Sequence, residues 1–252
     1  MIRIILHGAC GHMGRVVAEC AEKDPELRIV AGVDAFDDGK RPFPVFGKLS
    51  DVSEAADVVI DFSTAAAADG LLADAEEKGL PVVLCTTGLS EEQLARVREA
   101  SGRIPVLRSA NMSLGVNTIE KLVAEAARIL AGAGFDIEIE EMHHRRKLDA
   151  PSGTALMLAD AANEGAGGDY EYVYGRAERR LARPEKEIGI SSLRGGTVVG
   201  EHKVVFAGPD EMVTISHSAF SRAIFANGAI AAAKFLAGAA PGLYSMQDVV
   251  AK

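Results

Sequence analysis

Residues 141–155, with the sequence EMHHRRKLDAPSGTA, gather side chains that carry protons or positive charge. His143 and Lys147 stand four residues apart, so a turn can bring them together, and either can donate a proton to a substrate. His143 and His144 are expected to end a strand and to point to its opposite sides, so only one of them needs to face a cleft. The pattern predicts a site where a substrate gains a proton.

The end of the same segment has the features of a helix start. Pro151 suits the first turn of a helix, and the first backbone N–H groups of a helix have no acceptor within it, so they can bind an anion. In this sequence those groups belong to Ser152, Gly153 and Thr154. With the cations before them, they predict a substrate that carries carboxylates and accepts a proton during reduction.

Three other interpretations fit the segment less well. The paired histidines could bind a metal, but no third His, Cys or carboxylate follows at a spacing that completes such a site. The two arginines and Lys147 could form a solvated face, and Ser152 could be a simple N-cap. We therefore expect no metal and assign no chemistry to Arg145 and Arg146.

A glycine-rich turn, GACGHMGR, follows the apolar run at residues 2–6 and places glycine at Gly8, Gly11 and Gly14. Such glycines permit a tight turn and a close approach of the backbone to a pyrophosphate at the N-terminus of the next helix. Cys10 occupies the position of the middle glycine in the usual G-x-G-x-x-G pattern. A tight turn without a ligand is the alternative, which the strand, turn and helix context disfavours.

Asp34 ends the next predicted strand, 20 residues beyond Gly14. A carboxylate at this place accepts hydrogen bonds from the adenosine ribose of a dinucleotide. Its charge favours NADH because it repels the 2′-phosphate of NADPH, whereas Lys40 and Arg41 offer that phosphate a partner. The sequence therefore predicts NADH or NADPH and leaves the choice open.

Two further strand ends, DFST at residues 61–64 and CTTG at residues 85–88, are expected at the same carboxyl edge of the sheet. Ligands bind at this edge in open α/β folds, and small hydroxyl side chains suit a nicotinamide ribose. Thr86 and Thr87 could instead cap a helix or form a turn, and Phe62 could be ordinary core.

These motifs follow short β-branched runs that alternate with longer stretches rich in Ala, Leu and Glu, which is typical of a parallel sheet with crossover helices. A helix over residues 90–102 has Ser90 as its N-cap and Gly102 at its end. The expected strands cover residues 2–6, 28–34, 57–63, 81–87 and 104–110. We predict a doubly wound α/β domain over residues 1–112.

The pattern of expected helices and strands changes after about residue 113. A long helix over 114–134, a strand over 135–144 and a helix after Pro151 come before strands within 187–219, which Gly-rich turns join into an expected meander. This mixture predicts a second, α+β domain over residues 113–219.

Two segments remain. A largely apolar helix over 220–238 must pack on an extensive surface, and we expect residues 220–252 to complete the first domain. Residues 163–187 are polar and rich in arginine without a clear period, which is typical of a loop or an assembly surface.

Net charge and cysteine content exclude several classes of protein. A net charge of -9 over 252 residues argues against nucleic acid or an anionic membrane as the main partner. The three cysteines, Cys10, Cys20 and Cys85, form no C-x-x-C pair, so neither a disulfide framework nor a zinc ribbon is expected. Without a signal peptide or a membrane-spanning run, we expect a cytoplasmic protein.

The motifs GACGHMGR, DFS, TTG, ANMSLGVN, HHRRKLDAPSGTA, GEH and SRAIFANGA occur in one order along nearly the whole chain. In these motifs the sequence resembles the 4-hydroxy-tetrahydrodipicolinate reductase family, also called dihydrodipicolinate reductase. The resemblance implies a Rossmann-like domain with a second α+β domain for substrate and oligomerisation, and a homotetramer. It also implies NAD(P)H-dependent reduction of a cyclic dicarboxylate, 4-hydroxy-tetrahydrodipicolinate, with loss of water, on the diaminopimelate route to lysine.

The resemblance implies roles for particular residues. His143 and Lys147 become the catalytic residues that handle the proton. Substrate carboxylate would be held by His144, Ser152, Gly153 and Thr154. Cofactor would be held by Gly8, Ala9, Cys10, Gly11, His12, Met13, Asp34, Cys85, Thr86, Thr87, Ser109, Ala110, Asn111 and Met112. Cys85 stands where many relatives have glycine.

Two other hypotheses were weighed against the reductase. A non-catalytic dinucleotide sensor would keep the glycine turn but would have no need for His143 and Lys147 together. A different Rossmann reductase acting on another small carboxylate would not explain the tandem histidines beside the Pro-Ser-Gly-Thr turn.

Overall fold

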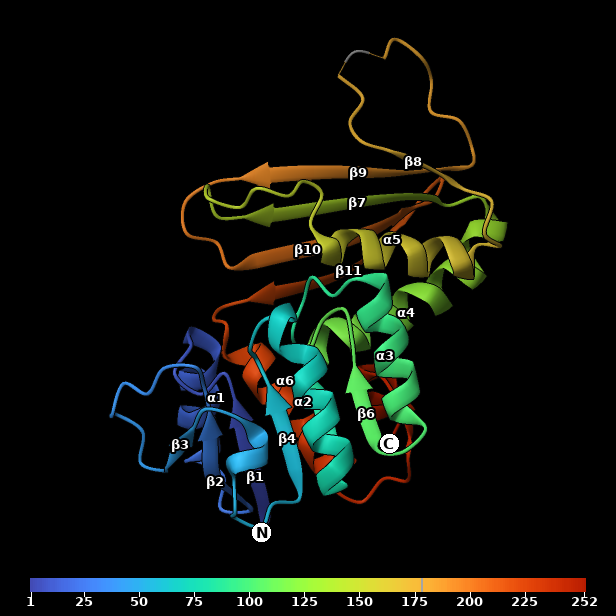
Figure 1. Cartoon of the computed structure of the whole chain (residues 1–252). Helices are drawn as coiled ribbons and strands as arrows, with labels where there is room; N and C mark the ends of the chain where they lie inside the picture. The colour runs from blue at the N-terminus through green and yellow to red at the C-terminus, as the bar shows by residue number, and fades with distance from the viewer. Residues whose placement is uncertain (178) are drawn as a thin grey trace. The chain divides into compact units, whose positions relative to one another are not determined.

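The computed structural model describes residues 1–177 and 179–252, and the chain divides into two compact units. The first unit combines residues 1–114 with residues 222–252, and the second unit comprises residues 115–221 (Figure 1). None of the described helices is long and apolar enough to cross a membrane.

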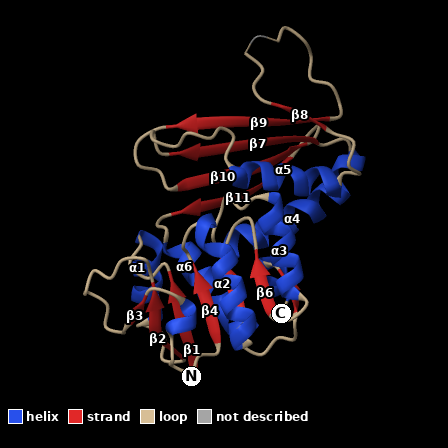
Figure 2. Ribbon diagram, viewed as in Figure 1, coloured by secondary structure: helices blue, strands red, loops and turns tan. Residues whose placement is uncertain are grey.

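The first unit is built on a sheet of seven parallel strands in the order β12-β6-β5-β4-β1-β2-β3. Its strands are β1 (Ile2–His7), β2 (Leu27–Val33), β3 (Val45–Phe46), β4 (Val58–Asp61), β5 (Val82–Leu84), β6 (Pro105–Arg108) and β12 (Gly242–Tyr244). Its helices are α1 (His12–Ala21), α2 (Ala65–Lys78), α3 (Glu91–Ser101), α6 (Ala223–Leu236), α7 (Met246–Ala251) and the 3-10 turn η1 (Leu49–Asp51). The predicted doubly wound, Rossmann-like class is confirmed (Figure 2).

Alternation along the strands builds a core on each face of this sheet. Ile4 and Leu6 of β1 pack with α1 and α6, whereas Ile5 packs on the opposite face with α2, α3 and η1. Side chains of a fully buried parallel strand point to the two faces in turn, so both faces need a helical cover. The helices on both sides supply it.

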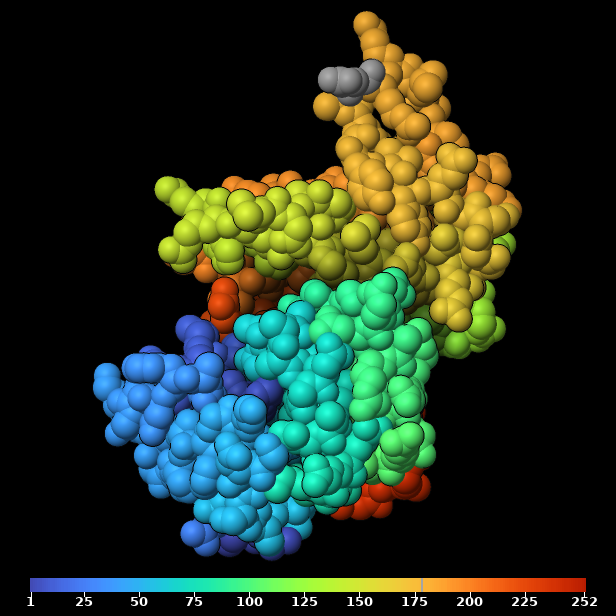
Figure 3. All heavy atoms as spheres, in the orientation of Figure 1, coloured from blue at the N-terminus to red at the C-terminus, as the bar shows by residue number. Residues whose placement is uncertain are grey.

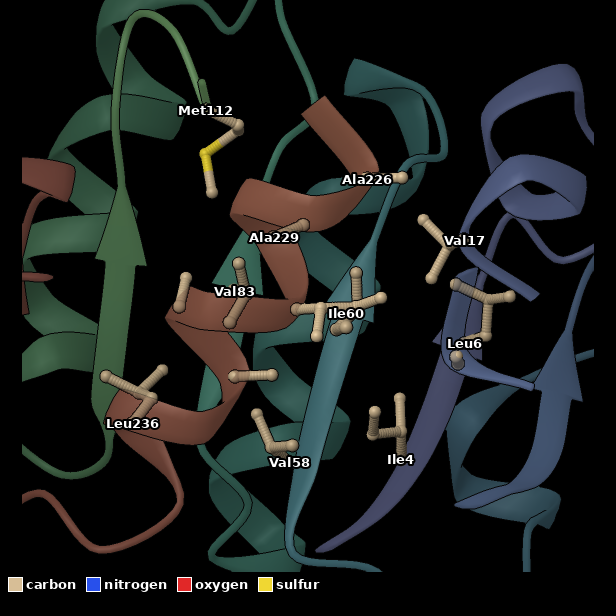
Figure 4. Packing of buried hydrophobic residues seen from close by; sticks show 14 of the residues in the cluster. Ile4, Leu6, Val17, Val58, Ile60, Val83, Met112, Ala226, Ala229 and Leu236 are labelled. Carbon is tan, nitrogen blue, oxygen red and sulfur yellow. The ribbon is translucent and has the colours of Figure 1, made fainter. Parts of the chain in front are cut away.

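Helix α6 lies across β4, β5 and β6 and against α1, and mainly alanines line its buried side (Figure 4). Small side chains let the helix come close to its neighbours. At Gly228 the approach reaches a limit, because a Cβ atom there would lie 1.6 Å from the carbonyl oxygen of Met112. The C-terminal helix α6 thus packs within the first unit.

The second unit has a five-stranded sheet in the order β11-β10-β7-β9-β8. Its elements are α4 (Leu114–Leu130), the 3-10 turn η2 (Ala131–Ala133), β7 (Asp136–His143), α5 (Gly153–Gly165), β8 (Glu171–Val173), β9 (Glu187–Arg194), β10 (Gly200–Ala207) and β11 (Met212–Ala219). Helices α4 and α5 cover one face through a core that includes Val123, Leu158, Ile139 and Phe206. The fold of this unit is α+β, as predicted.

The expected meander is wrong in one respect. β10 and β11 form an antiparallel hairpin, but β7 lies between β9 and β10, and β9 runs parallel to β7. A parallel neighbour requires a crossover connection, and α5 supplies it between β7 and β9. The Gly195-Gly196 turn therefore does not join adjacent strands.

The arginine-rich segment, predicted as a loop or an assembly surface, is ordered at both ends. It contains the end of α5 and the short strand β8, and residues 174–177 and 179–186 protrude from the second unit (Figure 3). Arg176 and Arg179 pair with the buried Glu187 at 2.6 and 2.8 Å, and Arg183 pairs with Asp136 at 2.6 Å. Arginine therefore fastens this segment to the starts of β7 and β9.

Replacing Gly228 by alanine should destabilise the protein by about 1 to 3 kcal/mol, because the added methyl group meets a backbone carbonyl that cannot rotate away. The melting temperature in thermal unfolding measures the loss. Gly70→Ala in α2 is the matched control, since nothing lies within 4 Å of the added atom. It should leave stability unchanged or raise it by about 0.5 to 1 kcal/mol. Equal melting temperatures for the two variants would contradict the close packing of α6.

Candidate functional site

The glycine-rich turn connects β1 to α1 at the carboxyl edge of the first sheet. Gly8 has a φ angle of +78°, and a Cβ atom there would lie 2.6 Å from the carbonyl oxygen of Phe62. A Cβ atom on Gly14 would lie 2.2 Å from the carbonyl oxygen of Gly8. Both positions therefore require glycine, and the N-terminus of α1 opens at the point between β1 and β4 where the strand order reverses, the usual ligand position in such sheets.

Asp34 is held against this turn. Its Oδ2 accepts a hydrogen bond from the Cys10 backbone N–H at 2.9 Å, so Cys10 fits the middle position without obstructing it. Asp38, four residues further, pairs with Arg15 at 3.1 Å and lies 3.7 Å from Arg41. Arg41, one of the two cations that the sequence offered to a 2′-phosphate, thus already lies beside a carboxylate.

A pocket of about 240 Å³ lies at the same edge of the first unit. Six of the predicted cofactor residues line this pocket: Cys85, Thr87, Ser109, Ala110, Asn111 and Met112. Phe62 and Phe225, which the sequence did not assign to the cofactor, line it as well. Burial raises the pKa of the Cys85 thiol well above its usual value, so Cys85 lines the pocket as a small neutral group. A cysteine at position 85 therefore does not prevent these residues from lining one pocket.

A fully buried carboxylate, Asp61, organises the ends of the central strands. It accepts a hydrogen bond from the Thr86 hydroxyl at 2.6 Å and one from the Ser63 backbone N–H at 3.1 Å, and it contacts His7 Nδ1 at 2.7 Å. The Thr86 hydroxyl is therefore committed inside the protein rather than to a ribose. The Ser109 hydroxyl accepts from the Met246 N–H at 2.6 Å and keeps its own O–H as a donor.

A second fully buried carboxylate, Glu141, lies in the second unit and was missed by the sequence analysis. Its Oε2 lies 2.5 Å from His143 Nδ1, and its two oxygens receive the Arg194 guanidinium at 2.8 and 2.7 Å. The Ser152 backbone N–H also donates to it, at 3.2 Å. Strand period alone could have pointed to Glu141, because it shares the inner face of β7 with Ile139 and His143.

Burial and charge set the protonation of this group. Burial alone raises the pKa of Glu141, but hydrogen bonds from Arg194, His143 and Ser192 outweigh it and lower the pKa to about 2. Burial lowers the pKa of His143 more than the bond to Glu141 raises it. Burial, followed by the charge of His143, lowers the pKa of His202 to about 4. The carboxylate is ionised at neutral pH and both imidazoles are neutral.

Lys147 reaches this neighbourhood through the predicted turn, whose Lys147 N–H donates to the His144 carbonyl at 3.1 Å. Its ammonium pairs with Asp149 at 2.8 Å, and the hydrogen bond from Lys147 lowers the pKa of that carboxyl. Arg194 donates to the Asp149 carbonyl at 2.6 Å. Lys147 and the Glu141 group are therefore linked through Asp149 and Arg194.

Helix α5 begins where the sequence predicted, with Ser152 as N-cap and Gly153 as its first residue. The Ser152 hydroxyl accepts from the Ala155 N–H at 3.1 Å and lies 3.0 Å from His202 Nε2. Ser152 thus uses both its hydroxyl and its N–H within the protein, contrary to the expectation that its N–H faces a ligand. Gly153 and the following Thr154 stay at the open end of the helix.

Neither His143 nor His144 belongs to a described cluster of three potential metal ligands. The one described cluster with ligand geometry is Cys10, Asp37 and Asp38 in the first unit, away from His143 and His144 in sequence. His143 is turned to Glu141, while the His144 backbone N–H donates to the Val198 carbonyl at 2.8 Å.

Comparison with known proteins accounts for both units. The family model "Dihydrodipicolinate reductase, N-terminus" matches residues 2–112, and "Dihydrodipicolinate reductase, C-terminus" matches residues 115–250. The chain belongs to the dihydrodipicolinate reductase family. The reductase is an oxidoreductase that uses NADH or NADPH to reduce 4-hydroxy-tetrahydrodipicolinate on the diaminopimelate route to lysine, as predicted.

Individual relatives agree with this family. The reductase is 56% identical to 4-hydroxy-tetrahydrodipicolinate reductase of Caldanaerobacter subterraneus, over 100% of this chain and 99% of that one. It is 46% identical to the same enzyme of Clostridium botulinum, over 99% and 98%. A dipicolinate-bound dihydrodipicolinate reductase structure from Paenisporosarcina superposes with a TM-score of 0.82 at 25% identity, over 98% and 99%.

Replacing Thr86 by valine in this reductase removes one donor from the buried Asp61 carboxylate at nearly constant shape. The variant should lose about 1 to 3 kcal/mol of stability, the usual cost of leaving a buried acceptor without its partner. Thr87→Val makes the same chemical change at an exposed neighbour and should leave the melting temperature unchanged. A Thr86→Val protein as stable as its parent would show that Asp61 does not depend on this hydroxyl.

Proposed function

We propose that His143 and Lys147 handle the proton in this reduction. Bound nicotinamide supplies a hydride, and the substrate then carries negative charge that a proton must neutralise. The observation that carries this assignment is the buried contact of His143 Nδ1 with Glu141, beside a lysine that the next turn holds. The 4-hydroxyl group leaves as water in the overall reaction.

We further propose that the open end of α5 holds a carboxylate of the substrate. Gly153 and Thr154 are the first two residues of the helix, whose N-terminal end favours negative charge, and His144 and Lys147 add polar and cationic groups nearby. The dipicolinate in the similar structure supports a cyclic dicarboxylate as the ligand. Ser152 serves this site by fixing the helix start.

Lys147→Ala and His143→Ala should each lower kcat by about 100-fold to 10,000-fold, the usual contribution of a proton donor. Oxidation of NADH or NADPH is followed with substrate made in place from pyruvate and aspartate semialdehyde by the preceding synthase. Arg146→Ala, an exposed cation of the same segment, is the control and should keep its kcat. If both variants fold and turn over normally, neither His143 nor Lys147 is a catalytic residue.

We propose that the first unit binds the dinucleotide and prefers NADH. The turn from Gly8 to Met13 would hold the pyrophosphate, Asp34 the adenosine ribose, and the 240 Å³ pocket the nicotinamide end. The preference follows because Asp34 repels a 2′-phosphate, while Asp38 draws Arg15 and Arg41 into ion pairs within the protein.

Asp34→Asn should therefore lower kcat/KM for NADH by about tenfold or more, since a hydrogen bond to a charged group contributes about 1.5 to 3 kcal/mol. The value for NADPH should fall less. The ratio of the two kcat/KM values in the synthase-coupled assay measures the change. An unchanged ratio would contradict the role of Asp34 in cofactor choice.

We propose that the reductase is a homotetramer assembled through the second unit. The face of its sheet opposite α4 and α5 carries partly exposed or exposed residues such as Glu140, Ser191, Lys203 and Met212. A sheet with only one covered face offers a self-complementary surface for a second copy. Sedimentation equilibrium should give the mass of four chains, and a monomer at micromolar concentration would contradict the proposal.

A further inference from the structure

The hydrogen-bond partners of the Glu141 carboxylate are all donors. One oxygen meets His143 Nδ1 and an Arg194 nitrogen, and the other meets the second Arg194 nitrogen and the Ser152 N–H. Its exposed fraction is 0%, so water does not complete its shell. A bidentate guanidinium at 2.8 and 2.7 Å keeps such a carboxylate ionised.

An ionised carboxylate can only accept hydrogen bonds. At 2.5 Å from Glu141 Oε2, His143 Nδ1 must therefore be the donor and carry a proton. A neutral imidazole has one N–H, so its other nitrogen, Nε2, is then an acceptor.

We infer that Glu141 is a positioning residue that fixes the Nδ1–H tautomer of His143 and leaves Nε2 as the atom that exchanges a proton with the substrate. The inference builds on the proposed catalytic role of His143. It assigns Glu141 no contact with substrate, because its side chain is fully buried.

Space around Nε2 agrees with this assignment. A Cβ atom at position 200 would lie 3.0 Å from His143 Nε2, so Gly200 leaves room beside that nitrogen. In the described part of the chain, the one side-chain hydrogen bond of His143 is the one at Nδ1. The His202 ring stands edge-on to the His143 ring, with centroids 5.1 Å apart, and holds it from the β10 side.

The charges that face His143 determine in which direction a substitution of Glu141 changes the pKa of His143. Arg194 from β9 and Lys147 from the following turn both disfavour the imidazolium, and the neutral His202 from β10 adds no negative charge. Among these groups Glu141 alone favours it. Replacing Glu141 by glutamine should therefore lower the pKa of His143 further.

The first test uses the unaltered protein. The chain has six histidines, so a sample labelled with ¹⁵N at histidine gives few ring signals, and those missing from His143→Asn belong to His143. Two-bond ¹H–¹⁵N spectra at neutral pH should show His143 protonated at Nδ1 and bare at Nε2. A proton on Nε2 alone would overturn the inference whatever any variant does.

The second test compares Glu141→Gln with Glu164→Gln. Glu164 is an exposed glutamate near the end of α5, on the side of the sheet opposite the proposed assembly surface. Removing the Glu141 charge should lower the pKa of His143, so the pH above which kcat falls should decrease by about 1 to 3 units. At pH 7 kcat should fall about 10-fold to 1,000-fold, the fall should shrink at lower pH, and KM should change little. Glu164→Gln should match the parent.

A purely structural role for Glu141 gives a different result. It would lower the melting temperature or raise KM while the pH profile of the remaining activity stays in place, and that outcome overturns the inference. Glu141→Asp keeps the charge and should keep the profile near that of the parent. If His143→Ala turns over normally, the proposed function fails, whereas the tautomer measurement still decides the role of Glu141. If Glu141→Gln does not fold, the spectrum of the unaltered protein decides alone.

Discussion

The placement of His143, the proposed proton-handling residue, depends on one buried ionic interaction, that of Glu141 with Arg194. A carboxylate taken out of water is costly unless its oxygens are saturated with donors. Glu141 meets this condition by drawing in the end of β9 through Arg194, the start of α5 through Ser152 and the ring of His143. The same interaction that stabilises the fold therefore fixes where the His143 ring lies and, in the inferred tautomer, which nitrogen it presents to the proposed substrate site.

The first unit solves a related problem with Asp61. This carboxylate is also fully buried at the end of a central strand, and its donors come from the ends of β1 and β5 and from its own turn. Both carboxylates lie where strands stop and loops must hold a defined shape. Such a rigid base suits a site whose ligand contacts would come largely from backbone groups.

Local signals predicted much of this architecture. Ser90 and Gln93 form the capping box at the expected start of α3, and Gly8 and Gly14 are required by backbone contacts that the motif implies. What the sequence could not reveal are pairs of residues far apart along the chain. Arg194 lies 53 positions from Glu141, and His7 lies 54 from Asp61, and no periodicity connects them. The insertion of β7 between β9 and β10 was missed for the same reason, since register across a sheet depends on partners that turns alone do not identify.

Gly228 packs against Met112 in the first unit, although the whole second unit separates the two residues along the chain. The first unit is completed by residues 222–252, which leave the ribosome after the whole second unit. Until α6 and β12 arrive, Val58, Ile60 and Val83 lack their helical cover (Figure 4), and β6 is an open edge. Nascent domains usually fold from the N-terminus as they emerge. Here the second unit can complete its structure first, and the half-finished first sheet is the species exposed to aggregation and to chaperones during synthesis.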